Sequence, residues 1–175
     1  RMRTPLTSFS TIPRQRNFQK FKKACEKLGP IVNLTTTGPV DLHSKYGGIF
    51  FYGIHQVDGI VELLGTRVRA VNVIPHGQGG VAVLWYQNGP TVTMNLVNNG
   101  NPTFHWSAVG DKKVLDWGLE NDELPYLTGA KLFVKMFRTG EEPISRQRLL
   151  APVAILEAMD KSLKLNRPVR VSALD

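Results

Sequence analysis

The sequence is short of several features that would assign it quickly to a class of protein. It has one cysteine, Cys25, which excludes an internal disulfide and favours a reducing compartment. No apolar run approaches the ~20 residues needed to cross a bilayer, and the chain opens without a signal-peptide pattern. We therefore expect a cytoplasmic protein with no membrane partner.

The sequence also has no motif for nucleotide binding, for zinc binding or for a serine nucleophile. There is no P-loop, no zinc-type cysteine spacing and no Gly-x-Ser-x-Gly elbow. The glycines of residues 77–80 lie between two predicted strands, whereas phosphate binding needs a helix N-terminus directly after them, so they predict a hairpin turn. Asp41-x-His43 and His55-x-x-Asp58 each offer two metal ligands, fewer than a site needs. We expect no cofactor-binding or metal-binding residues in this chain.

The net charge of +8 raises the alternative of a nucleic-acid site. Residues 1–30 carry eight basic groups and one acid, while the other 145 residues carry 14 basic and 13 acidic groups. The aromatic residues of the basic stretch, Phe18 and Phe21, recur at the spacing of a buried helix face. This pattern favours a solvated basic face, and we expect no nucleic-acid partner.

The order of predicted elements indicates an α+β fold. Hydrophobic periodicity predicts helices near residues 18–28, 49–64, 125–137 and 143–166. Short β-rich runs predict strands at residues 31–37, 68–74, 81–86, 91–97, 103–109 and 113–117, with 169–171 as a last short strand. Short connections predict an antiparallel meander without parallel crossovers. The expectation is an open, mostly antiparallel sheet of about six strands with helices packed on one face.

The sequence also predicts which residues lie on the covered face of the sheet and on the buried face of the last helix. Alternation in two neighbouring strands predicts one covered face built from Val81, Val83, Trp85, Val92, Met94 and Leu96, and an exposed sheet face that is unusually apolar if it pairs with a second copy. In the last helix, Pro152 should produce a kink or mark the start. Its buried face should hold Leu149, Val153, Leu156, Met159 and Leu163.

The segment Gly47–Asp58 is the one credible active-site element. On a helix, Tyr52, His55 and Asp58 form a polar stripe, while Phe50, Ile54, Val57 and Val61 occupy a side that would bury against the sheet. Gly53 allows a ligand or another backbone to approach closely beside His55. Histidine is the side chain best suited to proton transfer near neutral pH. The competing interpretation is a buried histidine capped by a neighbour.

At these residues the sequence resembles the C-terminal domain of the glucose–fructose oxidoreductase/inositol dehydrogenase (Gfo/Idh/MocA) family. The resemblance rests on Gly47-Gly48, on Gly53-Ile54-His55-Gln56-Val57-Asp58 and on Leu63-Leu64-Gly65. The order of elements is similar too: helix, strand, loop, active-site helix, meander and a long final helix.

The resemblance implies a two-domain parent enzyme in which an N-terminal Rossmann domain binds NAD or NADP. Residues 13–175 would form the C-terminal domain, which binds substrate and oligomerises, and residues 1–12 a linker or the end of the Rossmann domain, with Thr7–Thr11 as its last strand. Arg1 before Met2 agrees with a fragment. The parent would be an NAD(P)-dependent oxidoreductase acting on a sugar-like or polyol substrate. This chain alone would bind no NAD and would be inactive, since the resemblance places the nucleotide-binding domain outside it, and the family's catalytic lysine has no counterpart in it.

The resemblance also implies roles for single residues. His55 would be catalytic, and Tyr52, Asp58, Lys45 and Tyr46 would bind a small-molecule substrate. Family dehydrogenases commonly place an aspartate one turn before the histidine, where this chain has Phe51. Phenylalanine neither accepts a proton nor orients an imidazole, which favours the alternative of a non-catalytic relative used for ligand sensing or assembly. In either case a homodimer or tetramer would form through the open sheet face.

Overall fold

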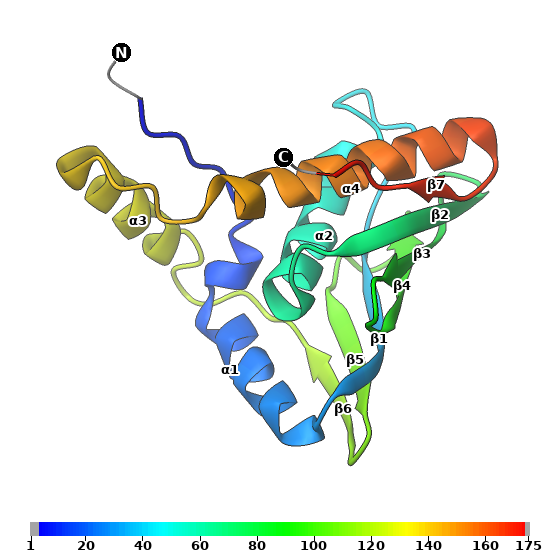
Figure 1. Ribbon diagram of the computed structural model, residues 1–175, viewed down its shortest axis with the longest axis horizontal. Helices are drawn as coiled ribbons and strands as arrows, with labels where there is room; N and C mark the ends of the chain where they lie inside the picture. Colours follow the sequence, from blue (N-terminus) through cyan, green and yellow to red (C-terminus); the bar gives the residue numbers. More distant parts are fainter. Residues whose placement is uncertain (1–3, 174–175) are drawn as a thin grey trace.

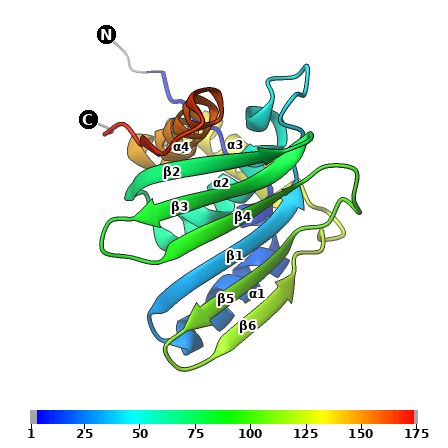
Figure 2. The ribbon, with the colours of Figure 1, turned by 90° about the vertical axis from the view of Figure 1, so that its right-hand side faces the viewer.

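The computed structural model describes residues 4–173, in which helices pack on one face of a seven-stranded sheet (Figures 1 and 2). The predicted α+β fold is confirmed. The helices are α1 (Arg16–Cys25), α2 (Ile49–Leu64), α3 (Leu127–Thr139) and α4 (Arg146–Leu165). The strands are β1 (Ile31–Pro39), β2 (Val68–His76), β3 (Gly79–Tyr86), β4 (Thr91–Val97), β5 (His105–Gly110), β6 (Val114–Gly118) and β7 (Val169–Arg170). None of these helices is long and apolar enough to span a membrane.

The helix boundaries follow local chemistry. Helix α1 buries Phe18, Phe21 and Cys25, and after one turn of 3-10 helix the chain reverses at Gly29, whose φ of 74° favours glycine. Helix α4 begins after Ser145, whose hydroxyl accepts the backbone N–H of Arg148 at 3.2 Å. An N-cap of this kind satisfies one of the donors left open by a helix start.

The sheet is not the uninterrupted meander that the connections predicted. Its order is β6-β5-β1-β4-β3-β2-β7, with β1 between β4 and β5 and parallel to β4 (Figure 2). The prediction of no parallel crossover was wrong because it considered only the short connections between later strands. The chain leaves β1 through α2 and returns to β1 only after β2 and β3, so the helix and the β2–β3–β4 meander together provide the crossover.

The covered face predicted from alternation was also wrong. Ala82 pairs with Met94 and both are fully buried under the helices, whereas Val83 pairs with Thr93 on the opposite face. Val92, Met94 and Leu96 therefore face the helices, while Val81, Val83 and Trp85 face outward and are half-buried. The sequence of a strand shows which of its residues alternate between two faces. The register with the neighbouring strand decides which set of residues on one strand shares a face with which set on the other.

Helix α4 agrees with its prediction only in part. Pro152 lies buried within the helix, six residues after its first residue, so it does not mark the start, and the alternative of a kink stays a prediction. Val153 is 48% exposed, although Leu156 and Met159 are buried as predicted. The true inner face also includes Ile155 and Ala158.

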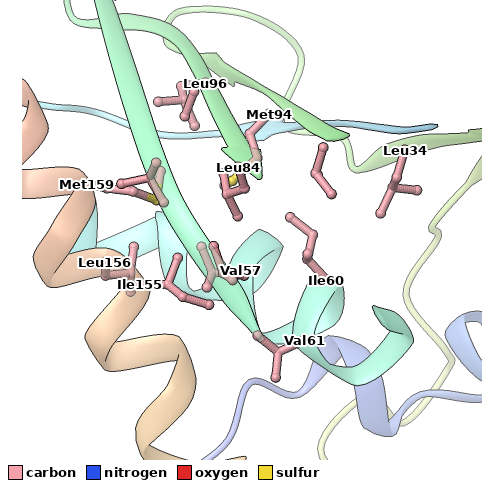
Figure 3. Packing of buried hydrophobic residues seen from close by; sticks show 14 of the residues in the cluster. Leu34, Val57, Ile60, Val61, Leu84, Met94, Leu96, Ile155, Leu156 and Met159 are labelled. Atoms are coloured by element: carbon pink, nitrogen blue, oxygen red, sulfur yellow. The ribbon is translucent and has the colours of Figure 1, made fainter. Parts of the chain in front are cut away.

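The core fills the space between the sheet, α2 and α4, and Figure 3 shows Val57, Leu84 and Leu156 meeting there. One polar side chain belongs to this core. Gln56 is fully buried, accepts the hydroxyl of Thr36 at 2.7 Å, and donates to the carbonyl oxygens of Gly38 (3.3 Å) and Asn95 (3.4 Å). Because these partners lie on β1 and β4, Gln56 fixes α2 against the parallel strand pair and thereby fixes the residues on the other side of the helix.

Candidate active site

Helix α2 turns its sheet side into the core and presents His55 on the side that faces the N-terminal segment. The His55 Nδ1 atom lies 2.8 Å from the hydroxyl oxygen of Ser10. No described residue forms a hydrogen bond with Nε2, and this atom is not among the buried side-chain atoms without a partner. Nε2 is therefore the ring nitrogen left for a ligand.

Ser10 connects His55 to Asp58. Its backbone N–H donates to Asp58 Oδ2 at 2.8 Å, and its hydroxyl accepts the backbone N–H of Ile12 at 3.2 Å. Asp58 is 2% exposed, and its other oxygen accepts Arg148 Nη1 at 2.5 Å. Arg148 also donates to the Asp58 carbonyl oxygen at 3.0 Å. Both Asp58 oxygens are thus engaged by the protein, an arrangement that suits a residue holding its neighbours in place.

Glu62 continues the same stripe one turn beyond Asp58. It pairs with Arg14, Lys22 and Arg148, which come from three different elements. Burial alone would raise the pKa of Glu62, but the hydrogen bond from Lys22 and the charges of Arg14, Lys22 and Arg148 outweigh it and lower the pKa. The stripe therefore ends in a structural ion cluster that ties the N-terminal segment and α4 to α2.

A row of exposed aromatic rings leads from the loop before α2 to His55. Tyr46 lies 5.1 Å from Phe51, Phe51 lies 5.0 Å from Tyr52, and Tyr52 lies 5.6 Å from His55, all between ring centroids. Phe104 closes the row on the other side of His55, at 6.1 Å. The Nζ of Lys45 stands 5.0 Å from the Tyr46 ring.

The structure thus brings together four of the five residues predicted for the site, namely exposed Lys45, Tyr46 and Tyr52 and half-buried His55. Their roles toward a substrate stay predictions. Asp58 lies behind them, buried against Ser10 and Arg148. Gly53 is approached by a side chain of α4, since a Cβ there would stand 3.2 Å from Leu156 Cδ2. Its small size serves helix packing, which corrects the expectation of a ligand beside it.

Sequence reasoning missed Ser10. It lies 45 residues before His55, in the segment predicted to be a linker or the end of another domain, and no spacing rule connects the two. Thr7–Thr11 pairs with no strand in residues 4–173, and its assignment to a Rossmann domain stays a prediction. Arg1 and Met2 lie outside the described residues.

Burial lowers the pKa of His55 below its usual value, and the nearby Asp58 carboxylate opposes this only in part. The unfolded chain then takes up the proton first as the pH falls. Acidification from about pH 6.5 down to the lower folded pKa should therefore reduce the free energy of unfolding. Urea unfolding at several pH values should show a smaller loss for His55→Gln than for the wild type over this window. An equal loss in both proteins would contradict this prediction.

No group of three or more His, Cys, Asp or Glu side chains in residues 4–173 is placed to hold a metal ion. Two surface hollows lie away from His55, on the β2–β7 edge, with volumes of about 410 and 670 Å³. Arg69 and Arg170 line both. The predicted hairpin turn lies between β2 and β3, where Gly77 and Gln78 form the turn, Gly79 and Gly80 begin β3, and no helix follows directly.

Among known proteins, the chain is similar to solved structures only. No protein-family model matches the sequence, and no curated protein matches it. Among solved structures, the chain is similar to a scyllo-inositol dehydrogenase from Lactobacillus casei with bound NAD(H) and scyllo-inositol, at 14% identity and a TM-score of 0.77, over 95% of this chain and 65% of that one.

Two further structures agree. A myo-inositol dehydrogenase from Lactobacillus casei in complex with NAD(H) and myo-inositol has 12% identity and a TM-score of 0.78, over 98% of this chain and 64% of that one. A probable dehydrogenase from Thermotoga maritima has 22% identity and a TM-score of 0.69, over 92% of this chain and 63% of that one. This chain thus spans slightly less than two thirds of these dehydrogenases, and it has the fold expected from its resemblance to the C-terminal domain of the Gfo/Idh/MocA family.

Proposed function

We propose that this chain is the substrate-binding and dimerisation part of an NAD(P)-dependent oxidoreductase that acts, in the cytoplasm, on a sugar-like or polyol substrate. The observation that carries the proposal is His55. Its Nε2 is open on the outer side of α2, in a fold shared with inositol dehydrogenases. Exposed Tyr46 and Tyr52 offer an aromatic surface beside it, which suits the apolar C–H face of a sugar ring, and their hydroxyls can bond to its oxygens.

The cofactor would bind to a part of the parent protein outside this chain. Residues 77–80, which have the glycine spacing closest to a dinucleotide motif, do not fit this ligand, because they close a hairpin and precede no helix. We expect calorimetric titration of NAD or NADP into the 175-residue chain to show no binding, and the chain to show no dehydrogenase activity with inositols. Tight binding of either cofactor by this chain would contradict the proposal.

A second candidate function is ligand sensing or assembly without catalysis. Phe51 favours it, because this residue is 46% exposed and meets Tyr46 and Tyr52 at the position where an aspartate was expected. Under this alternative, a polyol would bind to the parent protein but no reduced nicotinamide would form. Absorbance of reduced nicotinamide during incubation with a panel of sugars and polyols separates the two functions.

Oligomerisation is proposed to use the sheet face opposite the helices (Figure 2). The central positions of this face on β1, β4 and β5 are uncharged, and β3 adds an apolar strip. These residues are Thr35, Thr37, Thr91, Thr93, Ser107, Val81, Val83 and Trp85, all half-buried. The face is less apolar than expected, but its lack of charge leaves little that a second copy would have to desolvate. Light scattering that shows a monomer at micromolar concentration would count against this interface.

A further inference from the structure

The hydrogen bonds around Ser10 determine where its hydroxyl proton lies. The hydroxyl oxygen accepts the backbone N–H of Ile12, and its remaining contact is His55 Nδ1 at 2.8 Å. Ser10 is 4% exposed, so solvent hardly reaches it. A serine hydroxyl has one proton to donate, and among the described residues His55 Nδ1 is the acceptor in reach.

The opposite arrangement leaves a buried donor unpaired. If Nδ1 carried a proton and donated it to Ser10, the serine oxygen would accept twice and its own proton would have no acceptor. Burying an unpaired donor is unfavourable, whereas donation from Ser10 to Nδ1 satisfies every group. A neutral imidazole that accepts at Nδ1 carries its proton on Nε2, the nitrogen left for a ligand.

We infer that Ser10 is a positioning residue that holds His55 as the neutral tautomer protonated at Nε2, so that His55 donates a hydrogen bond to a substrate oxygen, while the proton of an oxidised hydroxyl goes to a basic group of the parent protein outside this chain. The tautomer follows from this chain alone, and its role toward a substrate rests on the proposed function. Ser10 orients the His55 ring, as an aspartate one turn earlier would, but it favours a different protonation state. A carboxylate would favour the protonated ring, whereas a serine hydroxyl donating to Nδ1 favours the neutral one.

The test uses the sign of a pKa change. In Ser10→Ala the neutral form of His55 loses the bond it receives at Nδ1, so the pKa of His55 should rise by about one pH unit. The charged group that acts on His55, Asp58, is unchanged in this variant. The backbone N–H of residue 10 still reaches it, and Arg148 still pairs with it. NMR titration of the histidine ring protons measures the pKa, and His55→Gln identifies the signals of His55 among the four histidines.

Two further measurements complete the design. Ser10→Thr keeps the hydroxyl and should keep the wild-type pKa within about 0.3 unit. The ¹⁵N shifts of wild-type His55 near pH 8 should show Nδ1 unprotonated and Nε2 protonated. A pKa that falls or stays constant in Ser10→Ala, or a protonated Nδ1 in the wild type, overturns the inference. The ¹⁵N measurement needs no change at Ser10, so it decides the question even if Ser10→Ala unfolds. None of these outcomes depends on dehydrogenase activity, so failure of the proposed function is seen separately.

Discussion

Under the proposed function, replacing His55 by alanine in the full-length oxidoreductase is expected to lower kcat by about 10²- to 10³-fold, the usual cost of removing one preorganised donor to a developing oxyanion. The cause is the loss of the donor inferred at Nε2, the ring nitrogen that no residue in 4–173 occupies by a hydrogen bond. His55→Gln should retain more activity than His55→Ala, because an amide N–H can still donate. Initial rates of nicotinamide reduction in both variants measure the effect.

A matched control is His43→Ala. His43 is an exposed histidine on the loop before α2, and its replacement should leave kcat nearly unchanged. If His55 were the proton acceptor, His55→Gln would be as inactive as His55→Ala, because glutamine has no basic nitrogen. If both His55 variants kept the wild-type rate, His55 would have no catalytic role, and if the wild-type parent protein itself formed no reduced nicotinamide, the non-catalytic alternative favoured by Phe51 would replace the proposed function.

The sequence was sufficient wherever structure depends on local chemistry. The period of Phe18, Phe21 and Cys25 predicted α1, and the alternation of β4 predicted a strand with the same bounds as the structure. The stripe on α2 predicted that Tyr52 and His55 would lie together, because residues three apart on a helix are neighbours. The hairpin between β2 and β3, which turns at Gly77 and Gln78, followed from the order of strands around these glycines.

What the sequence did not predict depends on pairing between distant segments. The insertion of β1 between β4 and β5 rests on hydrogen bonds that no local pattern encodes. The assignment of Met94 and Val83 to opposite faces required the register of β3 against β4. Ser10 reaches His55 because the segment before α1 crosses α2, and the ion pairs of Arg14 and Lys22 with Glu62 fix that crossing. A single unremarkable serine gives no signal of this in the sequence.

The second large effect is expected from Arg148→Met, which should reduce the free energy of unfolding by about 3–5 kcal/mol, the range for breaking a buried ion pair on one side. Asp58 is 2% exposed, and without Arg148 its carboxylate would keep only the N–H of Ser10 as a hydrogen-bond partner among residues 4–173. Methionine roughly preserves the volume of the side chain, so most of the loss comes from the unpaired charge. Urea unfolding followed by circular dichroism measures it.

Two comparisons isolate the buried charge as the cause. Lys161→Met removes an exposed pair with Glu157, whose side chains are 52% and 55% exposed, and should cost no more than about 1 kcal/mol. Adding Asp58→Asn to Arg148→Met should recover part of the stability, because the amide oxygen still accepts the Ser10 N–H while the charge is gone. A cost for Arg148→Met as small as that of Lys161→Met would show that the pair does not stabilise the fold. Asp58 anchors the backbone of Ser10, so Arg148→Met should also loosen the contact between Ser10 and His55. The stability of this ion pair is thereby linked to the protonation of His55.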